Sequence, residues 1–300
     1  MDDTDIRLVL LLLENSRQPY RELAKRLGLS VNAVYNRLQN LVDTGVIARF
    51  ITSINLKYYN GTELWMFGHS TCDNLEMAIE NLVKNDCIFW TARSGGNYLY
   101  VGAYVKDMSQ IEAISTFVKA ATKMDDITVG IIANSLPSPP QGVALSDMDY
   151  RIINAIHHDS RRSIADIATE AGTSSKTVSN RLVKMEKNFL IQHSIEWYPD
   201  KVNDITAFFH AHLVDSGNKV KIGKEITNTF APNILFSISF VNIPDFLLFI
   251  TWARTMKTVS DLGLKLQQYP FKSVMTDVLF TGKIYDTWRD RDIEERGKRK

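Results

Sequence analysis

Apolar residues recur at spacings of three and four through the first fifty positions of the chain, which is the periodicity of one helix face. The pattern predicts helices over Asp5–Glu14 and Arg21–Leu27. A third helix is expected after Ser30, with Val34 and Leu38 in its apolar stripe. Three short helices in this order indicate a helix-turn-helix.

The ends of these helices carry residues that stop or cap a helix. Gly28 suits the left-handed backbone that ends the second helix. The hydroxyl of Ser30 can accept a hydrogen bond from a free amide in the first turn of the third helix. Gly45 ends that helix, and Val46–Ile51 follows as a strand. We therefore predict a winged helix-turn-helix domain.

The same pattern occurs twice in the chain. A shift of 144 positions aligns identical residues without a gap, among them Asp3 with Asp147, Ser16 with Ser160, Arg17 with Arg161, Gly28 with Gly172, Ser30 with Ser174, Val34 with Val178, Asn36 with Asn180 and Ile47 with Ile191. The second copy is predicted to contain helices over Asp149–His157 and Ile164–Glu170, a helix after Ser174 with Val178, Leu182 and Met185 facing inward, and a wing strand over Ile191–Trp197. A constant offset over so long a stretch indicates internal duplication.

The rest of each copy alternates strands and helices in the order βαββαβ, which is typical of a ferredoxin-like fold. The predicted elements of the first copy are Glu63–Thr71, Leu75–Lys84, Ile88–Arg93, Tyr98–Lys106, Ile111–Ala121 and Ile127–Ile132. Those of the second copy are Ile205–Val214, Val220–Thr229, Leu235–Phe240, Phe246–Ala253, Val259–Gln268 and Ser273–Thr281.

A segment rich in proline, serine and glycine, Ser135–Gly142, separates the copies and is predicted to be an exposed, fairly stiff linker. We expect winged helix-turn-helix domains over residues 1–58 and 146–202, ferredoxin-like domains over 59–135 and 203–285, a linker over 136–145 and a charged tail over 286–300.

Composition narrows the classes of function. Lys and Arg number 35 against 34 Asp and Glu, which excludes a strongly cationic protein but leaves room for a basic patch. Cys72 and Cys87 are too few for a disulfide framework, and no Cys/His cluster indicates a metal or another cofactor. The acidic N-terminus does not resemble an export signal. The apolar runs Leu8–Leu13 and Phe246–Trp252 are far shorter than the about 20 residues that span a bilayer, so we expect a cytoplasmic protein without membrane contact.

The helix-turn-helix sequence resembles the Lrp/AsnC (feast/famine) family of bacteria and archaea. The residues that carry the resemblance are Arg21–Ala24, Leu27–Ser30, Val34, Arg37–Leu38 and Gly45–Ile47 in the first copy, and Ile167–Ala168, Gly172–Ser174, Val178 and Arg181–Leu182 in the second, where Phe189 replaces Gly45. The resemblance implies an α+β fold in which two winged helix-turn-helix domains alternate with two ferredoxin-like domains of the RAM type. It further implies a transcriptional regulator that binds double-stranded DNA, responds to an amino acid or other small-molecule effector, and forms a homodimer or higher oligomer through its βαββαβ sheets.

The predicted DNA contacts lie on the outer face of each third helix, opposite its apolar stripe. Asn and Gln side chains can bind adenine through paired hydrogen bonds, each worth about 1–3 kcal/mol of discrimination, and Asn36 and Asn180 are the best candidates. Arg37 and Arg181 are expected to hold phosphate or to cap a neighbouring helix, and the arginines before and at the second helix to clamp the DNA backbone. The complete predicted set is Ser30, Asn32, Ala33, Tyr35, Asn36, Arg37, Gln39, Asn40, Arg17, Arg21 and Arg49 in the first copy, and Lys176, Thr177, Asn180, Arg181, Lys184, Arg161 and Arg162 in the second.

Two copies in one chain can pair internally as a covalent pseudo-dimer. Such a pair presents two helix-turn-helix modules to half-sites about 34–36 Å apart. Because the two outer faces differ, the preferred DNA site is expected to be an imperfect palindrome. Neither module is strongly basic, and the second is expected either to bind DNA weakly or to serve as an interaction domain.

The turns between the central strands are the candidate effector contacts, but they depart from the pattern of the family, in which a glycine is often followed by an acidic residue. The first copy has Ser94, Gly95, Gly96 and Asn97, without the acid, and the second has Asn242 and Asp245, without the glycine. A regulator without an effector is therefore the alternative.

Two other functions are considered. Some proteins that resemble this family are sirohaem decarboxylases built from paired copies of the same unit, and they need histidines and arginines over a large pocket. His69, His210 and His212 lie on predicted strands and are the candidates for that chemistry, although strand histidines are more often structural. The third function is an assembly protein that has lost DNA binding.

Overall fold

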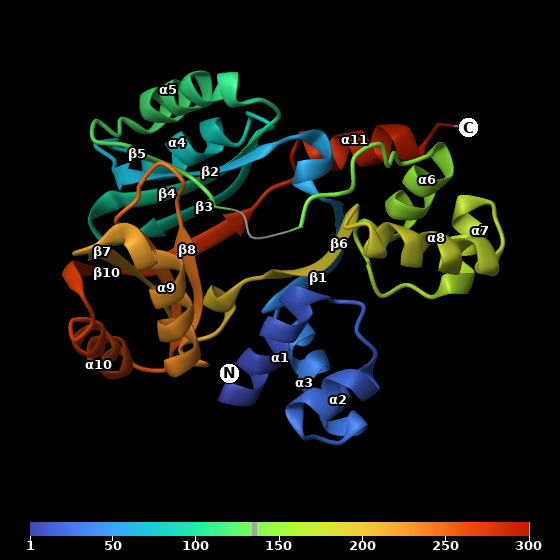
Figure 1. Ribbon diagram of the computed structural model, residues 1–300, viewed down its shortest axis with the longest axis horizontal. Coiled ribbons are helices and arrows are strands. Elements are labelled where there is room, and N and C mark those ends of the chain that lie inside the picture. Colours follow the sequence, from blue (N-terminus) through green and yellow to red (C-terminus); the bar gives the residue numbers. More distant parts are fainter. Residues whose placement is uncertain (134–136, 300) are drawn as a thin grey trace. The chain divides into compact units, whose positions relative to one another are not determined.

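The computed structural model describes residues 1–133 and 137–299 and groups them into two compact units (Figure 1). The sheet unit holds Met1, the described part of Thr62–Ser135, and Pro199–Tyr285. The helix-turn-helix unit holds Asp2–Gly61, the described part of Leu136–Tyr198, and the described part of Asp286–Lys300. Each unit combines the corresponding parts of both copies, while the boundaries of the individual domains stay predictions. The predicted linker falls partly on residues 134–136, outside the described residues; positions 137–142 are mostly exposed.

The helix-turn-helix unit contains two similar sets of three helices and a strand, as the sequence predicts. The elements are α1 (Asp3–Glu14), α2 (Tyr20–Leu27), α3 (Val31–Asp43) and β1 (Ile47–Ile54) in the first copy, α6 (Asp147–Ile156), α7 (Ile164–Ala171), α8 (Ser175–Lys187) and β6 (Ile191–Trp197) in the second, and a last helix, α11 (Trp288–Gly297).

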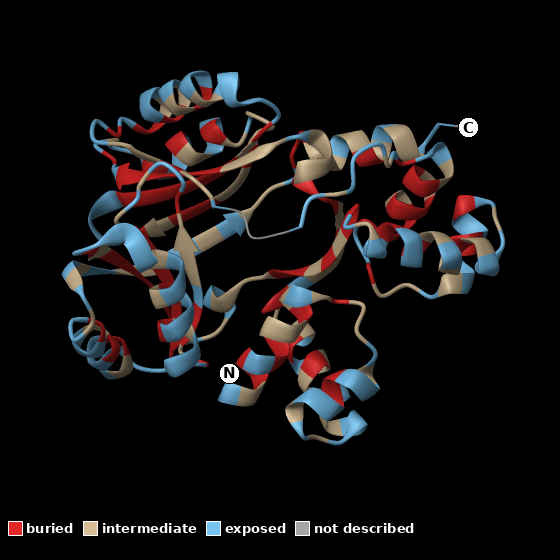
Figure 2. Cartoon of the chain, in the orientation of Figure 1, coloured by how far each residue is buried: buried red, intermediate tan, exposed pale blue. Residues whose placement is uncertain are grey.

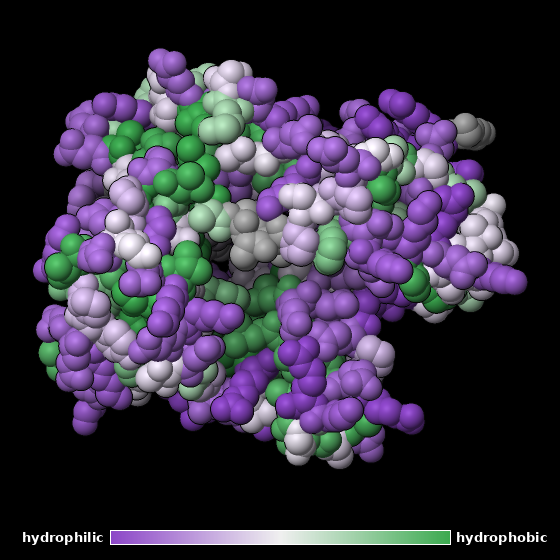
Figure 3. Space-filling model, viewed as in Figure 1, coloured by the Kyte–Doolittle hydropathy of each residue, from purple (hydrophilic) through white to green (hydrophobic). Residues whose placement is uncertain are grey.

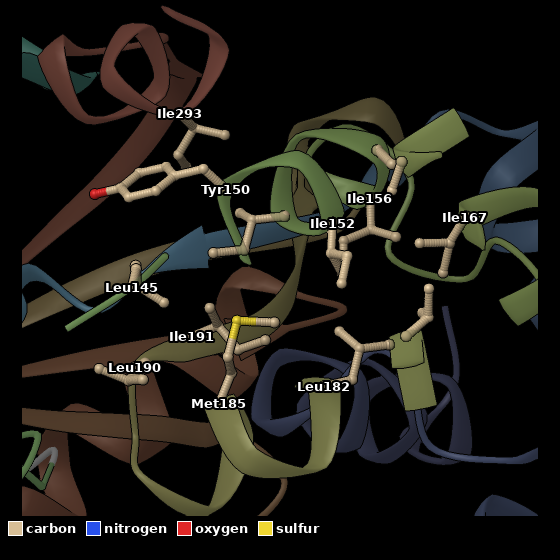
Figure 4. Packing of buried hydrophobic residues seen from close by; sticks show 14 of the residues in the cluster. Leu145, Tyr150, Ile152, Ile156, Ile167, Leu182, Met185, Leu190, Ile191 and Ile293 are labelled. Atoms are coloured by element: carbon tan, nitrogen blue, oxygen red, sulfur yellow. The ribbon is translucent and has the colours of Figure 1, made fainter. Parts of the chain in front are cut away.

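The predicted inward stripes are confirmed in both modules. Val34 and Leu38 of α3 are at most 1% exposed. In the second module Leu182 and Met185 of α8 pack with Ile156 of α6 in one buried cluster (Figure 4). Burial of these apolar faces, and not helix propensity, is the main stabilisation of such short helices.

The strands β1 and β6 do not form separate wings. They pair with each other in an antiparallel two-stranded sheet, with Phe50 opposite Ile195 and Ile51 opposite Ser194. β1 also packs on α6 of the second copy, and β6 packs on α1 of the first. Each predicted wing strand is therefore present, and it finds its hydrogen-bond partner in the other copy.

The sheet unit contains both βαββαβ parts, and each has the ferredoxin-like strand order. The first copy supplies β2 (Thr62–His69), α4 (Leu75–Leu82), β3 (Ile88–Ser94), β4 (Tyr98–Val105), α5 (Ile111–Thr122) and β5 (Thr128–Ile131). The second copy supplies β7 (Ile205–Leu213), α9 (Lys219–Thr229), β8 (Ile234–Ser239), β9 (Phe246–Ala253), α10 (Met256–Leu266) and β10 (Phe271–Ile284). Together they form one eight-stranded sheet in the order β5-β2-β4-β3-β10-β7-β9-β8.

Alternate residues of the strands serve two cores. Leu64 and Met66 of β2 pack with the residues of α4 and α5, whereas Trp65 and Phe67 point to the other face. There they join an aromatic cluster that includes Phe208 and Phe246 of the second copy. The helices thus cover the face of the sheet opposite the aromatic cluster, and buried residues run along the strands (Figure 2).

The last strand is longer than predicted because it has two successive partners. Phe271 to Val278 of β10 pair with β7 of the same copy. Leu279 to Ile284 then pair with β3 of the first copy. At the other edge, a bridge joins Ile132 to Phe240. Both junctions between the copies are therefore made by backbone hydrogen bonds.

The predicted charged tail forms the helix α11 over most of its length. Thr287 and Asp290 form a capping box at its start. Trp288 and Ile293 are buried, and Figure 4 shows Ile293 beside Tyr150 of α6. Polar contacts also hold this highly charged helix in place, among them the contact of Asp290 with His157 and the hydrogen bond from Tyr59 to Asp292. Within the described residues, no helix is long and apolar enough to cross a membrane.

Candidate nucleic-acid interface

Local sequence fixes the start of both recognition helices in the same way. Gly28 and Gly172 take positive φ angles of 68° and 66° and end α2 and α7. Ser30 Oγ accepts a hydrogen bond of 3.1 Å from the Ala33 amide. Ser174 Oγ accepts a bond of the same length from the Thr177 amide. The two helices are therefore positioned by the same turn and the same cap.

The outer face of α3 is exposed as predicted, and its chemistry is neutral. Asn32, Asn36 and Asn40 are exposed, whereas Ala33 and Gln39 are partly covered. Tyr35 is 49% exposed and its ring lies 5.7 Å from that of Tyr20. Hydrophilic residues cover most of the visible surface of this module (Figure 3).

The outer face of α8 is exposed too, but it carries positive charge. Lys176, Asn180 and Lys184 are exposed, and Thr177 is partly covered. Val183, which is equivalent to Gln39, is 61% exposed. The two outer faces therefore share one amide position, Asn36 and Asn180, and differ around it.

Arg37 and Arg181 cap neighbouring helices, which was one of the two roles expected of them. Arg37 Nη1 lies 2.7 Å from Asp2 and 2.6 Å from Asp5, at the start of α1. Bonds to Asp5 and Asp2 raise the pKa of Arg37. Arg181 Nη1 likewise lies 2.8 Å from Asp149 of α6. Burial opposes the charged form of Asp149, but the bonds from Ser146 and Arg181 hold its pKa below the ordinary value.

Arg17 and Arg161, expected at the DNA backbone, join the two copies. Arg17 Nη1 donates to the carbonyl oxygen of Ser160, and Arg161 Nη1 donates to that of Ser16 at 2.6 Å. Between them the hydroxyls of Ser16 and Ser160 lie 2.6 Å apart. These contacts are related by a pseudo-twofold axis, because each residue bonds to the counterpart of its own neighbour. Sequence reasoning missed this role, since no local signal shows that two equivalent turns meet.

Two further arginines of the predicted set are also engaged within the protein. Arg162 Nη1 donates to Ala155 O at 2.6 Å and to Glu170 at 2.5 Å. Arg49 Nη2 lies 2.5 Å from Glu196 and 3.2 Å from Asp286, and the bond to Glu196 raises its pKa. By contrast, Arg21 is exposed in the first turn of α2.

The two predicted effector turns differ in their exposure and in the contacts that their side chains already make. Ser94 is buried, and Gly95, Gly96 and Asn97 form an exposed 3-10 turn. The side chain of Asn242 already bonds to the backbone of Ile131 and Val129. Asp245 forms an ion pair with Lys272 at 3.4 Å.

The candidate histidines lie around one aromatic cluster, where His69 and His210 both contact the ring of Tyr98, but their surroundings differ. His210 is 5% exposed, its Nε2 lies 2.6 Å from the Tyr100 hydroxyl, and that hydroxyl donates to Asp277 at 2.5 Å. His212 is half-exposed and contacts the same ring, Phe246, as His210 does. His69 is exposed, and its Nδ1 donates to the carbonyl oxygen of Gly96 at 3.2 Å.

Comparison with known proteins identifies both modules. A family model described as a winged helix-turn-helix DNA-binding domain matches residues 1–48, and one described as an AsnC-type helix-turn-helix domain matches residues 145–186. The HTH-type transcriptional regulator Ptr1 of Methanocaldococcus jannaschii is 37% identical over 120 residues, which are 39% of this chain and 79% of that protein. An uncharacterised HTH-type transcriptional regulator of Pyrococcus furiosus is 28% identical over 131 residues, 42% of this chain and 85% of that protein.

Likeness to solved structures extends over nearly the full length of the chain. The crystal structure of the siroheme decarboxylase NirDL has a TM-score of 0.63, with 98% of each chain covered and 12% sequence identity. At that identity the likeness concerns the paired fold alone. The helix-turn-helix models and the sequence relatives carry the assignment, and the chain belongs to the Lrp/AsnC family of helix-turn-helix transcriptional regulators.

Proposed function

We propose that this regulator binds double-stranded DNA as a single-chain pseudo-dimer, with α3 and α8 in two major-groove segments one helical turn apart. The observation that carries the proposal is the pair of exposed recognition helices held by reciprocal contacts between the copies, Arg17 with Ser160 and Arg161 with Ser16. A pseudo-twofold pair of helices matches the twofold symmetry of two inverted half-sites.

The first module would supply most of the base discrimination. Asn32 and Asn36 present amide groups that can bind the N6 and N7 positions of adenine. Tyr35 presents an apolar ring beside them, suited to the methyl group of thymine. We therefore propose an A·T-rich half-site for α3.

The second module would bind with more charge and less base discrimination. Lys176 and Lys184 flank Asn180, and lysine is a point charge that binds phosphate or guanine. Because the two faces differ, the proposed operator is an imperfect palindrome. Of the predicted arginines, Arg21 alone is retained as a proposed phosphate contact; Arg17, Arg49, Arg161 and Arg162 are left out because each guanidinium group already makes at least one bond within the protein.

In the sheet unit, the exposed turn Gly95–Asn97 is retained as the proposed effector contact, together with Ser94 and Asp245. Asn242 is omitted because the oxygen and the nitrogen of its side-chain amide both already bond to backbone atoms. Association of further copies through the sheets and a cytoplasmic location, where bacterial and archaeal genomes lie, complete the proposal.

The test is a titration of the full chain with DNA selected from random duplexes, over a series of salt concentrations. The logarithm of the binding constant should fall linearly with the logarithm of salt concentration. Asn36→Ala should weaken binding to the selected DNA by roughly 5- to 150-fold, as expected for about 1–3 kcal/mol. Asn81→Ala, the same substitution on an exposed residue of α4, is the matched control and should change nothing. Unchanged binding by Asn36→Ala would refute the role of α3.

A second candidate function is suggested by the full-length fold likeness to a siroheme decarboxylase. Against it, the sheet face opposite the helices is filled by aromatic rings, and the neighbouring ring centres among Trp65, Phe67, Tyr100 and Phe208 lie at most 6.1 Å apart. His210 is bonded inside this cluster. We therefore propose a regulator without enzymatic activity. A new haem absorption band after incubation with an iron tetrapyrrole, absent in Tyr100→Ala, would support the enzyme instead.

A further inference from the structure

A cavity of about 510 Å³ that is open to solvent is formed by the helix-turn-helix unit and is lined by residues of both copies. Its walls are the start of α2, the end of α3 and the strand β1 of the first copy, and the turn between α6 and α7 of the second. Cavities that hold small ligands have about 300–1,000 Å³. The size therefore suits a small organic molecule.

Arg161 places an available cation in this cavity. Its guanidinium carbon lies 4.6 Å from the ring centre of Tyr20 and 5.6 Å from that of Phe50, which fixes its plane. Its side-chain hydrogen bonds to Ser16 and Gln18 all come from Nη1. Within the described residues the polar contacts of this guanidinium are to backbone carbonyl oxygens, so Nε and Nη2 keep donors that match a carboxylate.

The other charged groups limit the ligand to a single negative charge. Arg49 also lines the cavity, but Glu196 and Asp286 neutralise it. Asp159 lines the cavity as well, and its carboxylate accepts the backbone N–H of Arg161. Because Asp159 lies beside Arg161 in the lining, repulsion disfavours a polyphosphate more than a ligand with one negative charge.

Most of the remaining lining is apolar; the exception is His158, whose ring nitrogens lie 3.0 Å from Arg49 and 3.6 Å from Glu294. Val42, Ile47 and Phe50 form a wall for a hydrophobic body, and Ala48 leaves space between them. On the equivalent side of the pseudo-twofold axis, Gln192 stands in place of Ala48. Ser194 stands in place of Phe50, and its hydroxyl donates to the carbonyl oxygen of Leu13 at 3.1 Å. The duplicated halves have therefore diverged at this position.

We propose that the cavity binds a small aromatic monocarboxylate, with the carboxylate on Arg161 and the ring against Val42, Ile47 and Phe50. Because both copies line the cavity, a bound molecule contacts both modules and stabilises one arrangement of α3 relative to α8. That regulatory consequence rests on the proposed DNA binding, whereas the binding site itself does not.

The test uses isothermal titration of the full chain with benzoate, without DNA, so that a failure of DNA binding does not affect the result. Benzoate should bind at least about tenfold more tightly than benzamide, which lacks the charge, and than acetate, which lacks the ring. Equal binding of all three molecules, or no binding of benzoate at millimolar concentration, would overturn the proposal.

Two variants test the location. Ala48 is exposed at a register shift of β1, so Ala48→Trp can fill the cavity and leave the polar contacts of Arg161 in place. This variant should weaken benzoate binding more than about tenfold. Gln192→Trp places the same residue at the equivalent position and should stay within about twofold of the native chain. Arg161→Lys keeps the charge but loses the planar donor pair, and should weaken benzoate binding more than benzamide binding. Benzoate binding that survives Ala48→Trp would place the site elsewhere and refute the assignment.

Discussion

The two helix-turn-helix modules of this chain have nearly the same interior and different exteriors. Ser30 and Ser174 cap their recognition helices with equal geometry, and Arg37 and Arg181 tie those helices to equivalent acidic residues. Outside, neutral amides on α3 stand where α8 carries lysines. The difference indicates that residues which position the helix were retained in both halves, whereas residues that would touch DNA changed independently.

The largest effect is expected from the shared interior. Leu38→Ala and Leu182→Ala each remove a buried side chain and should lower the free energy of unfolding by about 2–5 kcal/mol. Urea denaturation measures both. Similar losses would support equivalent scaffolds, and a loss in one module more than twice that in the other would break the comparison.

A feature found only in the second module should make its stability depend on pH. His157 is buried and its Nε2 lies 3.3 Å from Asp290 of α11. Burial opposes the charged imidazole, but the carboxylate of Asp290 and the carbonyl of Thr52 outweigh it and raise the pKa of His157. For Asp290, burial is likewise outweighed by His157 and Arg289, and its pKa is lowered.

These directions set the pH window. A raised histidine pKa stabilises the fold below the unfolded value near 6.5 and loses that contribution as pH rises through the folded value. A lowered aspartate pKa stabilises the fold above 3.8 and loses it as pH falls. Thermal unfolding should therefore show a maximum from this pair between about pH 4 and 6.5. Asp290→Asn should remove this maximum and lower the free energy of unfolding by about 1–3 kcal/mol. An unchanged pH profile would contradict the pairing of His157 with Asp290.

The exteriors should differ in their response to salt. Lys176→Ala with Lys184→Ala should reduce the slope of log K against log salt by about 0.9 for each phosphate that the two lysines bind in the native chain. Asn32→Ala with Asn36→Ala should lower affinity for the selected DNA and leave the slope unchanged. Fluorescence anisotropy over a salt series measures both pairs, and equal slopes in all variants would show that α8 does not approach phosphate.

The smallest effect is expected from the caps. Ser30→Ala and Ser174→Ala should each destabilise the chain by about 1 kcal/mol, because each leaves one first-turn amide without its acceptor. Calorimetry of the two variants measures this effect. Equal shifts in Tm would confirm that the caps are equivalent, and a shift in only one variant would show that they are not.

Much of the fold could be predicted from local sequence. The helix ends fall within a few residues of the predicted ones because caps and glycines mark them, as at Ser30 and Gly172. The end of β10 was missed because its partner there is β3, far away in the sequence. The helix α11 was missed because Trp288 and Ile293 do not form a stripe spaced by three and four, although the capping box at Thr287 was a usable signal.

The candidate interface was predictable only in part, for a related reason. The exposure of Asn32 and Asn36 follows from helical periodicity and the apolar stripe. The contacts of Arg17 and Arg161 depend on two turns 144 positions apart coming together, and nothing in either turn shows this.

The reciprocal bonds of Arg17 and Arg161 have an evolutionary consequence. In a dimer of identical subunits every mutation occurs on both sides of the axis, so a damaging change at such a contact is felt twice. Here a mutation alters one bond and spares its counterpart. Each polypeptide also always contains one helix of either kind, in a fixed ratio and without mixed assemblies. Fusion thus lets one half drift toward a new target while the other half preserves the old one.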